Sequence, residues 1–150
     1  MAELTYMTLA LEEARAAAAY GEVPVGAVVV EVTTGRVLAQ MANRVEQDCD
    51  PTAHAELLAI RAAAKELGIP RLTKCDLYVT LEPCAMCAQA IALARVRRLI
   101  FGAYDPKGGG VEHGPRIFSQ PTCHHTPEVI GGMEEAACAA LLKEFFAGLR

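Results

Sequence analysis

The hydrophobic pattern along the chain has a helical period in three segments. Apolar residues recur every three or four positions, among many alanines and other helix formers, at residues 5–20, 52–68 and 133–149. Because a glycine often ends a helix, we expect the first two segments to stop at Gly21 and Gly68. The pattern therefore predicts amphipathic helices that each pack one face on a core.

Shorter runs rich in β-branched and apolar residues predict strands between these helices. We expect about five strands, at residues 25–32, 35–43, 75–82, 97–104 and 127–130. The first two are joined by the short turn TTGR, and a long surface loop at 105–126 precedes the last. Strands that alternate with helices are typical of βαβ units with helices on both faces of the sheet, and the early hairpin makes the predicted sheet mixed.

Length and composition favour a single α/β domain over residues 1–150. The chain is 53% hydrophobic, and 150 residues are enough for one core. Its longest apolar run, VPVGAVVV at 23–30, is strand-sized, whereas a membrane span needs roughly 18 residues. The N-terminal segment has glutamates where a signal peptide has lysines. We therefore expect a cytoplasmic protein that does not enter the membrane.

The formal net charge of the chain is −4. Proteins that bind nucleic acids electrostatically are usually basic, so the overall charge does not by itself indicate such a substrate. Binding to phosphate depends on local charge, however, and a basic patch would be sufficient. The candidates for such a patch are Arg95, Arg97, Arg98, Lys107, Arg116 and Lys143.

Two of the six cysteines lie in the stretch LEPCAMC, residues 81–87. We expect a helix over 83–96 with Pro83 at its first position, where the missing N–H costs nothing. Cys84 and Cys87 are then i and i+3, face the same way, and lie near free N–H groups that stabilise thiolates. In the reducing cytoplasm this pair fits a redox couple as well as half of a metal site.

A histidine thirty residues upstream, His54, lies in the predicted first turn of another helix, with Asp50 or Thr52 as its expected N-cap. A lone histidine there is more often a cap or a core residue. If the two helix starts face each other, His54 and the two cysteines supply three zinc ligands and leave the fourth position to water, as in a catalytic site. Glu56, at the same helix end, could then take the water's proton and pass it on.

The two halves of this pattern together are more specific than either alone. HAE, thirty residues and PCxxC match the H-x-E…P-C-x-x-C signature of zinc deaminases. The chain resembles the cytidine deaminase-like superfamily and, more closely, the bacterial tRNA adenosine deaminases, which convert the wobble adenosine of an anticodon to inosine. The matching stretches are EVPVGAVVV (22–30), NR (43–44), DPTAHAE (50–56), LYVTLEPCAMCAQA (77–90), FGAYDPKGG (101–109) and LLKEFF (141–146).

The resemblance implies a three-layer α/β/α fold, one zinc ion per subunit and a homodimer. In such a protein His54, Cys84 and Cys87 bind the zinc ion and Glu56 is the catalytic acid and base. Part of the apolar run AMCAQAIALA at 85–94 exceeds what one sheet contact requires, and we expect it in the dimer interface.

The resemblance also implies contacts with the anticodon arm of a tRNA. Asn43, at the end of the second predicted strand, would hydrogen-bond the purine, between walls formed by Val25 and Leu81. The simpler alternative for Asn43 is a role in shaping a turn.

Four more residues would touch the RNA in a protein of this family. Asp105 and Lys107 would contact anticodon ribose and phosphate, and Phe145 and Phe146 would lie near the bound loop. Alternatively, Lys107 is a solvated loop charge, and the two phenylalanines are core residues, as aromatics on an amphipathic helix usually are.

Two other functions stay open from the sequence. A deaminase of a free base or nucleoside, such as guanine, cytosine or an amino-triazine, would use the same zinc and Glu56 without a basic surface. A non-catalytic, zinc-stabilised binding module would need neither Glu56 nor an open coordination position. A separate cluster of Cys123, His124 and His125 is either a second metal site or an ordinary hydrogen-bonded loop.

Overall fold

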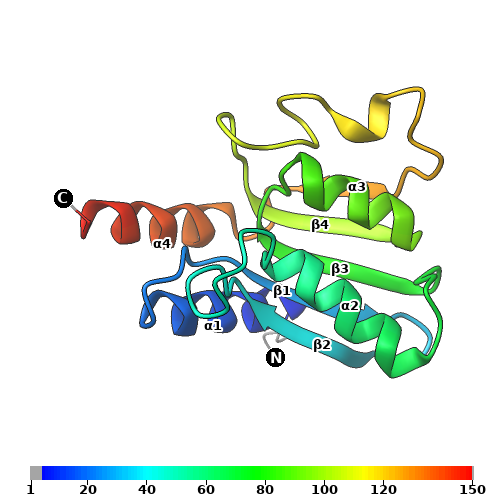
Figure 1. Ribbon diagram of the computed structural model, residues 1–150, viewed down its shortest axis with the longest axis horizontal. Helices are drawn as coiled ribbons and strands as arrows, with labels where there is room; N and C mark the ends of the chain where they lie inside the picture. The colour runs from blue at the N-terminus through cyan, green and yellow to red at the C-terminus, as the bar shows by residue number, and fades with distance from the viewer. Residues whose placement is uncertain (1–4, 150) are drawn as a thin grey trace.

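The computed structural model describes residues 5–149 of the chain. Figure 1 shows four α-helices around a central sheet. The helices are α1 (Tyr6–Ala18), α2 (Ala55–Leu67), α3 (Ala85–Ala94) and α4 (Glu135–Ala147), with a short 3-10 helix, η1 (Ile117–Ser119). The strands are β1 (Gly26–Glu31), β2 (Arg36–Ala42), β3 (Cys75–Leu81), β4 (Arg98–Ala103) and β5 (Glu128–Gly131). Each predicted helix and strand is present, within a few residues of its expected bounds.

The five strands form one mixed sheet in the order β2-β1-β3-β4-β5. β1 runs antiparallel to both β2 and β3, whereas β3, β4 and β5 are parallel to one another. The parallel strands are joined by helical or long crossovers, as such connections require. The predicted mixed sheet of about five strands is therefore confirmed.

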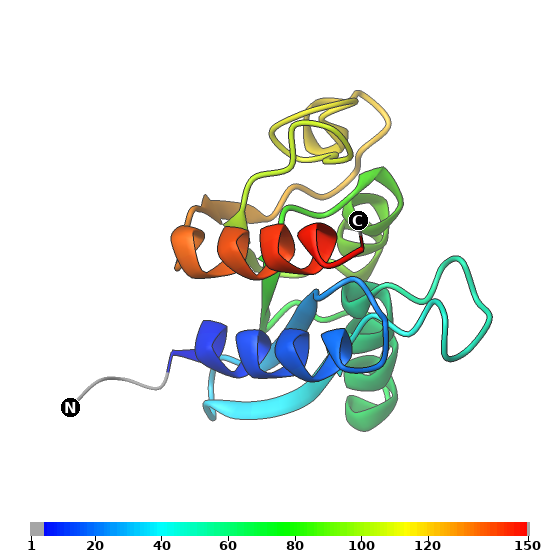
Figure 2. The same ribbon diagram turned by 90° about the vertical axis from the view of Figure 1, so that its left-hand side faces the viewer.

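Alternating side chains on the strands divide the core between two faces of the sheet. On β1, Ala27 and Val29 pack in the cluster that contains residues of α2 and α3, and Val28 and Val30 pack in the cluster with residues of α1 and α4. Figure 2 shows α1 and α4 on one side of the sheet and α2 on the other. The period-2 alternation thus produces the predicted three-layer α/β/α arrangement. No helix in the described part of the chain is long and apolar enough to cross a membrane.

The helix starts differ from the sequence prediction. His54, not Asp50 or Thr52, is the N-cap of α2, because Asp50 accepts the backbone N–H of Thr52 at 2.9 Å and closes a local turn instead. Cys84 is the N-cap of α3, so Pro83 lies just before the helix and not at its first position. Two of the three predicted metal ligands, His54 and Cys84, are therefore helix N-caps with extended backbone conformations, and the third, Cys87, lies in the first turn of α3.

The predicted helix ends are partly confirmed. Gly68 caps α2 with a left-handed φ of 70°, a conformation that suits glycine. The first helix ends earlier than expected. α1 stops at Ala18, and the left-handed Gly21 lies in the turn that follows it.

A glycine at the start of β1 permits α1 to pack directly on the sheet. A Cβ at Gly26 would collide with the backbone carbonyl of Ala10 in α1. We expect Gly26→Ala to lower the free energy of unfolding by about 3 kcal/mol, because the helix must move off its strand. Urea unfolding followed by circular dichroism measures this. Gly148→Ala is the control, because its backbone is right-handed and an added Cβ would make only ordinary van der Waals contacts there. Equal stabilities for the two variants would contradict the packing described.

Candidate metal centre and substrate pocket

Three side chains from two adjacent helix starts converge on one point. His54 comes from the N-cap of α2, Cys84 from the N-cap of α3, and Cys87 from the first turn of α3. The Nδ1 atom of His54 lies 3.6 Å from Cys84 Sγ and 3.5 Å from Cys87 Sγ. Among residues 5–149, these form the only group of three or more such side chains whose ligand atoms lie within 4.8 Å of one another.

These distances fit a tetrahedral zinc ion. Zn–S bonds of about 2.3 Å and Zn–N bonds of about 2.0–2.1 Å at the tetrahedral angle separate sulfur from nitrogen by about 3.6 Å. The two observed Nδ1–Sγ distances, 3.6 and 3.5 Å, agree with that separation. A redox couple needs no histidine placed equally close to both sulfurs, so the geometry favours the metal site over the redox alternative.

The electrostatics of the trio are those of a cation site. The pKa of Cys84 is lowered to about 4, chiefly because the Cys87 thiol donates a hydrogen bond to its thiolate; burial opposes this, and His54 adds to it. The same thiolate and burial raise the pKa of Cys87, and the hydrogen bond to Cys84 raises the pKa of His54. The trio thus favours a thiolate beside a histidine, which is a donor set that suits a divalent cation.

Glu56 is a buried carboxyl group in the first turn of α2, only 4% exposed. Burial is the main cause that raises its pKa to about 7, and the charge of Cys84 raises it further. Positions i and i+2 point apart within a helix, but His54 is an extended N-cap (φ −78°, ψ 148°), so both side chains line the same pocket. A carboxyl group that titrates near neutral pH can both accept and donate a proton.

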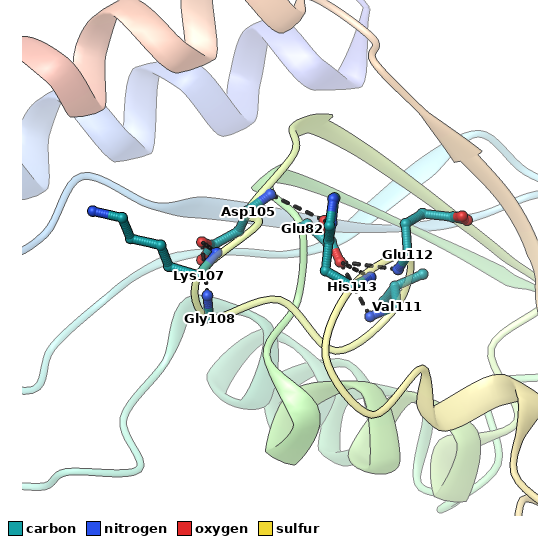
Figure 3. Close-up of polar contacts among 7 residues, drawn as sticks. All are labelled: Glu82, Asp105, Lys107, Gly108, Val111, Glu112 and His113. Atoms are coloured by element: carbon teal, nitrogen blue, oxygen red, sulfur yellow. Dashed lines mark hydrogen bonds and ion pairs between the residues drawn. The ribbon is translucent and has the colours of Figure 1, made fainter.

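The pocket over this trio has a volume of about 470 Å³. His54, Cys84 and Glu56 line it. Six of the seven predicted substrate contacts line it as well, namely Val25, Asn43, Leu81, Asp105, Phe145 and Phe146. Lys107 does not line the pocket; it lies on an exposed turn, and its side chain extends away from the other residues drawn in Figure 3. The structure therefore brings distant parts of the chain to one site, apart from Lys107.

The comparisons with known proteins agree with this site. Residues 2–103 match the family described as the cytidine and deoxycytidylate deaminase zinc-binding region. The chain is 57% identical over 147 residues to the tRNA-specific adenosine deaminase of Agrobacterium fabrum, covering 97% of this chain and 95% of that protein. The corresponding enzyme of Bacillus subtilis is 44% identical, with coverages of 97% and 89%.

The chain belongs to the tRNA-specific adenosine deaminase branch of this zinc-binding family. Among solved structures, one from a study of A-to-I editing by tRNA:A34 deaminases matches with a TM-score of 0.88 and 57% identity, over 91% of this chain and 97% of that one. A guanine deaminase from Nitrosomonas europaea matches with a TM-score of 0.77 and 29% identity, over 94% and 82%. The cytidine deaminase-like fold and the zinc site predicted from sequence are therefore confirmed.

In this deaminase Asn43 joins two parts of the site. Its Oδ1 accepts the backbone N–H of Ala55, the first residue of α2, at 2.8 Å. Asn43 thus caps the helix that carries His54 and Glu56, which explains why His54 needs no capping hydrogen bond of its own. The amide nitrogen of Asn43 is the group left for a ligand, so the turn-shaping and substrate-binding interpretations are compatible.

The two phenylalanines near the C-terminus lie at the rim of the pocket. Figure 1 shows the C-terminal part of α4, which carries them, extending beyond the ends of the strands. Their rings meet edge to face with centroids 5.3 Å apart, and Phe146 is 49% exposed. The core alternative is therefore wrong for Phe146, and Phe145 is half-buried beside it.

Two buried glutamates near the pocket were missed by sequence reasoning. The carboxylate of Glu82 accepts backbone N–H groups from the loop after β4, as Figure 3 shows, and that of Glu22 accepts the N–H groups of Glu46 and Gln47. Burial would raise the pKa of Glu82, but the N–H of Asp105 and the other donors outweigh it and hold that pKa below its usual value. No side-chain pattern signals these contacts, because apart from the His113 ring their partners are backbone N–H groups.

The cysteine and histidine cluster of the long loop is used for structure. His125 lies with its Nε2 2.7 Å from the Val96 carbonyl oxygen, and Cys123 donates to the His125 carbonyl at 3.2 Å. No second metal group occurs in the part of the chain that the structure describes. The ordinary hydrogen-bonded loop is therefore the correct alternative for these residues.

The predicted basic patch is wrong in joining Arg97 and Arg98 to Lys107. Arg97 and Arg98 lie at the start of β4, where they pair with Asp76 and Glu128. The pocket lies at the other end of this strand, about 20 Å away along six extended residues. Lys107 is exposed on the turn near the pocket and cannot share a patch with these arginines.

Proposed function

We propose that this protein is a zinc-dependent hydrolase that converts the wobble adenosine of a tRNA anticodon to inosine and releases ammonia. The observation that carries the proposal is a complete His54, Cys84, Cys87 and Glu56 site in a chain 57% identical to a tRNA-specific adenosine deaminase over nearly the whole length of both. Such enzymes act on a base that is taken out of its stack.

The mechanism assigns the metal and the proton transfers to different residues. His54, Cys84 and Cys87 would hold the zinc ion, which supplies a Lewis acid that makes water acidic enough to attack near neutral pH. Glu56 takes a proton from the attacking water and gives it to the ring nitrogen beside the amino carbon. As the water oxygen bonds to the amino carbon, Glu56 is left free to take the second proton, which comes from the new hydroxyl group. Glu56 delivers that proton to the amino group, the C–N bond breaks, ammonia leaves, and the carbonyl group of inosine forms. Burial raises the pKa of this carboxyl group above its usual value, as suits a group that both accepts and donates a proton.

The other pocket residues position the anticodon. Val25 and Leu81 form the walls around the purine, and the amide nitrogen of Asn43 donates to it. Asp105 and Lys107 reach the ribose and phosphate of the anticodon, with Lys107 acting from its exposed turn outside the pocket. The Phe145 and Phe146 rings on α4 lie against neighbouring bases, since bases stack well on exposed aromatic rings.

The main alternative function is deamination of a free base, which the structural match to a guanine deaminase supports. The reach of the pocket favours RNA. It runs from Glu56 beside the metal site to Leu149, which follows the C-cap of α4, and it includes an exposed aromatic ring. A single planar base would leave this outer part empty, whereas an anticodon loop would fill it.

Salt dependence separates RNA from a free base. We expect KM for an adenosine-wobble anticodon stem-loop to rise about threefold between roughly 50 and 200 mM salt for each phosphate contact, of which Lys107 supplies one. Initial rates of inosine formation measure this. Melting curves over the same salt range control for changes in the protein. A KM that does not respond to salt would contradict phosphate contact and favour a small neutral substrate.

The remaining parts of the proposal concern organisation. We propose one deaminase domain over residues 1–150 that forms a cytoplasmic homodimer with one zinc ion per subunit. Leu93 on α3 is 70% exposed, as an interface on that helix would explain. All six cysteines are free, as expected for a reducing compartment. A monomeric mass in solution would refute the dimer.

A further inference from the structure

Two fully buried glutamates flank the pocket without belonging to the metal trio. Glu22 is 1% exposed and Glu82 is 2% exposed, and both line the pocket. A buried carboxylate is costly unless hydrogen bonds replace its hydration. Each of the two is satisfied by backbone N–H groups of a different loop, so each ties one loop to the framework.

Glu82 ties down the loop that follows β4. Its Oε1 accepts the N–H of Asp105 at 3.0 Å and lies 2.8 Å from Nδ1 of His113. Its Oε2 accepts the N–H groups of Val111, Glu112 and His113 at 3.2, 2.9 and 3.2 Å. Figure 3 shows these groups converging on one carboxylate. Successive N–H groups of this kind form an anion-binding nest, and here the protein's own side chain fills it.

The loop held by Glu82 forms part of the pocket rim. Asp105 lines the pocket, and its Oδ1 accepts the N–H groups of Lys107 and Gly108 at 3.2 and 2.9 Å. A Cβ at Gly109 would collide with the Glu82 carboxylate, so the chain passes directly over it. The position of Asp105 is therefore set through Glu82.

Glu22 does the same for the loop between β2 and α2. Its Oε1 accepts the N–H of Glu46 at 3.1 Å, and its Oε2 accepts the N–H of Gln47 at 2.8 Å. Val45 and Glu46 of this loop line the pocket. A second part of the rim is thus held by a buried carboxylate from the segment before β1.

We propose that Glu22 and Glu82 are positioning residues that hold the two rim loops in the shape that binds RNA. The inference rests on the proposed function for the identity of the substrate. A preformed rim spares the complex the entropy cost of ordering loops on binding. The preformed rim stabilises the bound substrate and the transition state by the same amount. Losing it therefore raises KM and leaves kcat unchanged.

Amide hydrogen exchange tests the positioning role without RNA. In zinc-loaded Glu82→Gln, we expect the amides of Asp105, Val111, Glu112 and His113 to exchange at least about tenfold faster, since an amide nitrogen cannot accept their hydrogens. In Glu22→Gln the same increase should appear at residues 46 and 47 and not at the other loop. Glu12→Gln, an exposed site on α1, removes the same charge and should change neither.

Steady-state kinetics with the anticodon stem-loop test the consequence for binding. We expect KM to rise about tenfold in Glu22→Gln and in Glu82→Gln, with kcat within about twofold of wild type and one zinc per chain. His113→Ala leaves the four backbone contacts in place, so a rise of about threefold is expected. His124→Ala, at an exposed histidine of the same long loop (105–126), is its control and should behave as wild type.

The outcomes are distinguishable. If Glu82→Gln does not fold, Glu22→Gln and His113→Ala carry the same test. Amides that exchange at wild-type rates, or a fall in kcat at unchanged KM, would overturn the positioning role. Wild-type protein that leaves the stem-loop unchanged would instead refute the proposed function, and the exchange experiment would still decide whether the two glutamates hold the loops.

Discussion

Replacing Glu56 by glutamine is expected to reduce kcat for inosine formation by at least about a thousandfold while zinc stays bound. Glutamine keeps the size of the side chain but cannot accept a proton from water or deliver one to ammonia, and general acid–base catalysis contributes about 10²–10⁴-fold for one proton transfer. Because Glu56 serves more than one transfer, the loss should lie in the upper part of that range. Nucleoside analysis of reactions quenched at set times gives kcat, and atomic absorption gives the zinc content.

Glu66→Gln is the matched control for this variant. Glu66 lies on the same helix, α2, and its exposed side chain pairs with Arg36 at the surface, where such pairs contribute little. We expect it to retain wild-type turnover. A Glu56→Gln enzyme with near wild-type kcat would show that another group moves the protons, and loss of zinc would show that Glu56 holds the metal site together.

Removing zinc is expected to abolish turnover and leave the fold largely intact. The trio lies at the N-terminal ends of α2 and α3, whereas the remaining turns of both helices pack on the sheet through Ala59, Ala63 and Ile91. Chelation should therefore stop inosine formation, lower the melting temperature, and preserve the circular dichroism spectrum. Added zinc should restore activity. A protein that unfolds on chelation would instead indicate a structural zinc site.

Substitution of a single ligand also tests whether the trio binds zinc. Cys87→Ala should reduce bound zinc from one per chain to nearly none, with a matching loss of activity. Cys138→Ala is the control, because Cys138 is equally buried but lies in the other core cluster with α1. Activity that survives chelation and disappears on thiol alkylation would contradict the metal site and revive the redox alternative.

The metal trio could be predicted from sequence because its information is local. HAE and PCxxC each lie at a helix start. The extended backbone at His54 and Cys84 therefore directs both side chains beyond the ends of their helices. The strands and the layering followed from apolar runs and their alternation for the same reason. What remained open was whether the two helix starts face each other, which the spacing of the motifs suggests and the fold establishes.

The missed features depend on contacts between distant segments. The hydrogen bond that caps α2 comes from Asn43, which lies twelve residues before the amide that it binds. The sequence offers only residues next to the helix as candidate caps, and so the prediction of Asp50 or Thr52 was wrong. Glu82 is separated from its partners by 23 to 31 residues, and most of those partners are backbone N–H groups with no signature. The helical period left the exposure of Phe146 undecided for a similar reason, because it cannot show where α4 leaves the sheet.

The prediction that Arg97 and Arg98 share one basic patch with Lys107 was wrong, because residues close in sequence can lie far apart in the fold. Arg97 and Arg98 precede Lys107 by ten and nine residues, and strand β4 carries the chain across the sheet between them. Phosphate contacts near the pocket must come from groups at the end of the sheet where β3 and β4 finish. Lys107 is the candidate there that the sequence and the structure both retain.

The most direct test of the account is a product analysis of zinc-loaded protein given one substrate at a time. The substrates are an adenosine-wobble anticodon stem-loop, the same stem-loop with guanosine at that position, free adenosine, guanine and cytosine. Ammonia release and nucleoside analysis identify the product in each case. We predict inosine, with equal ammonia, from the adenosine stem-loop alone. Ammonia from a free base, with the stem-loop unchanged, would contradict the proposed function and assign the same zinc chemistry to nucleobase metabolism.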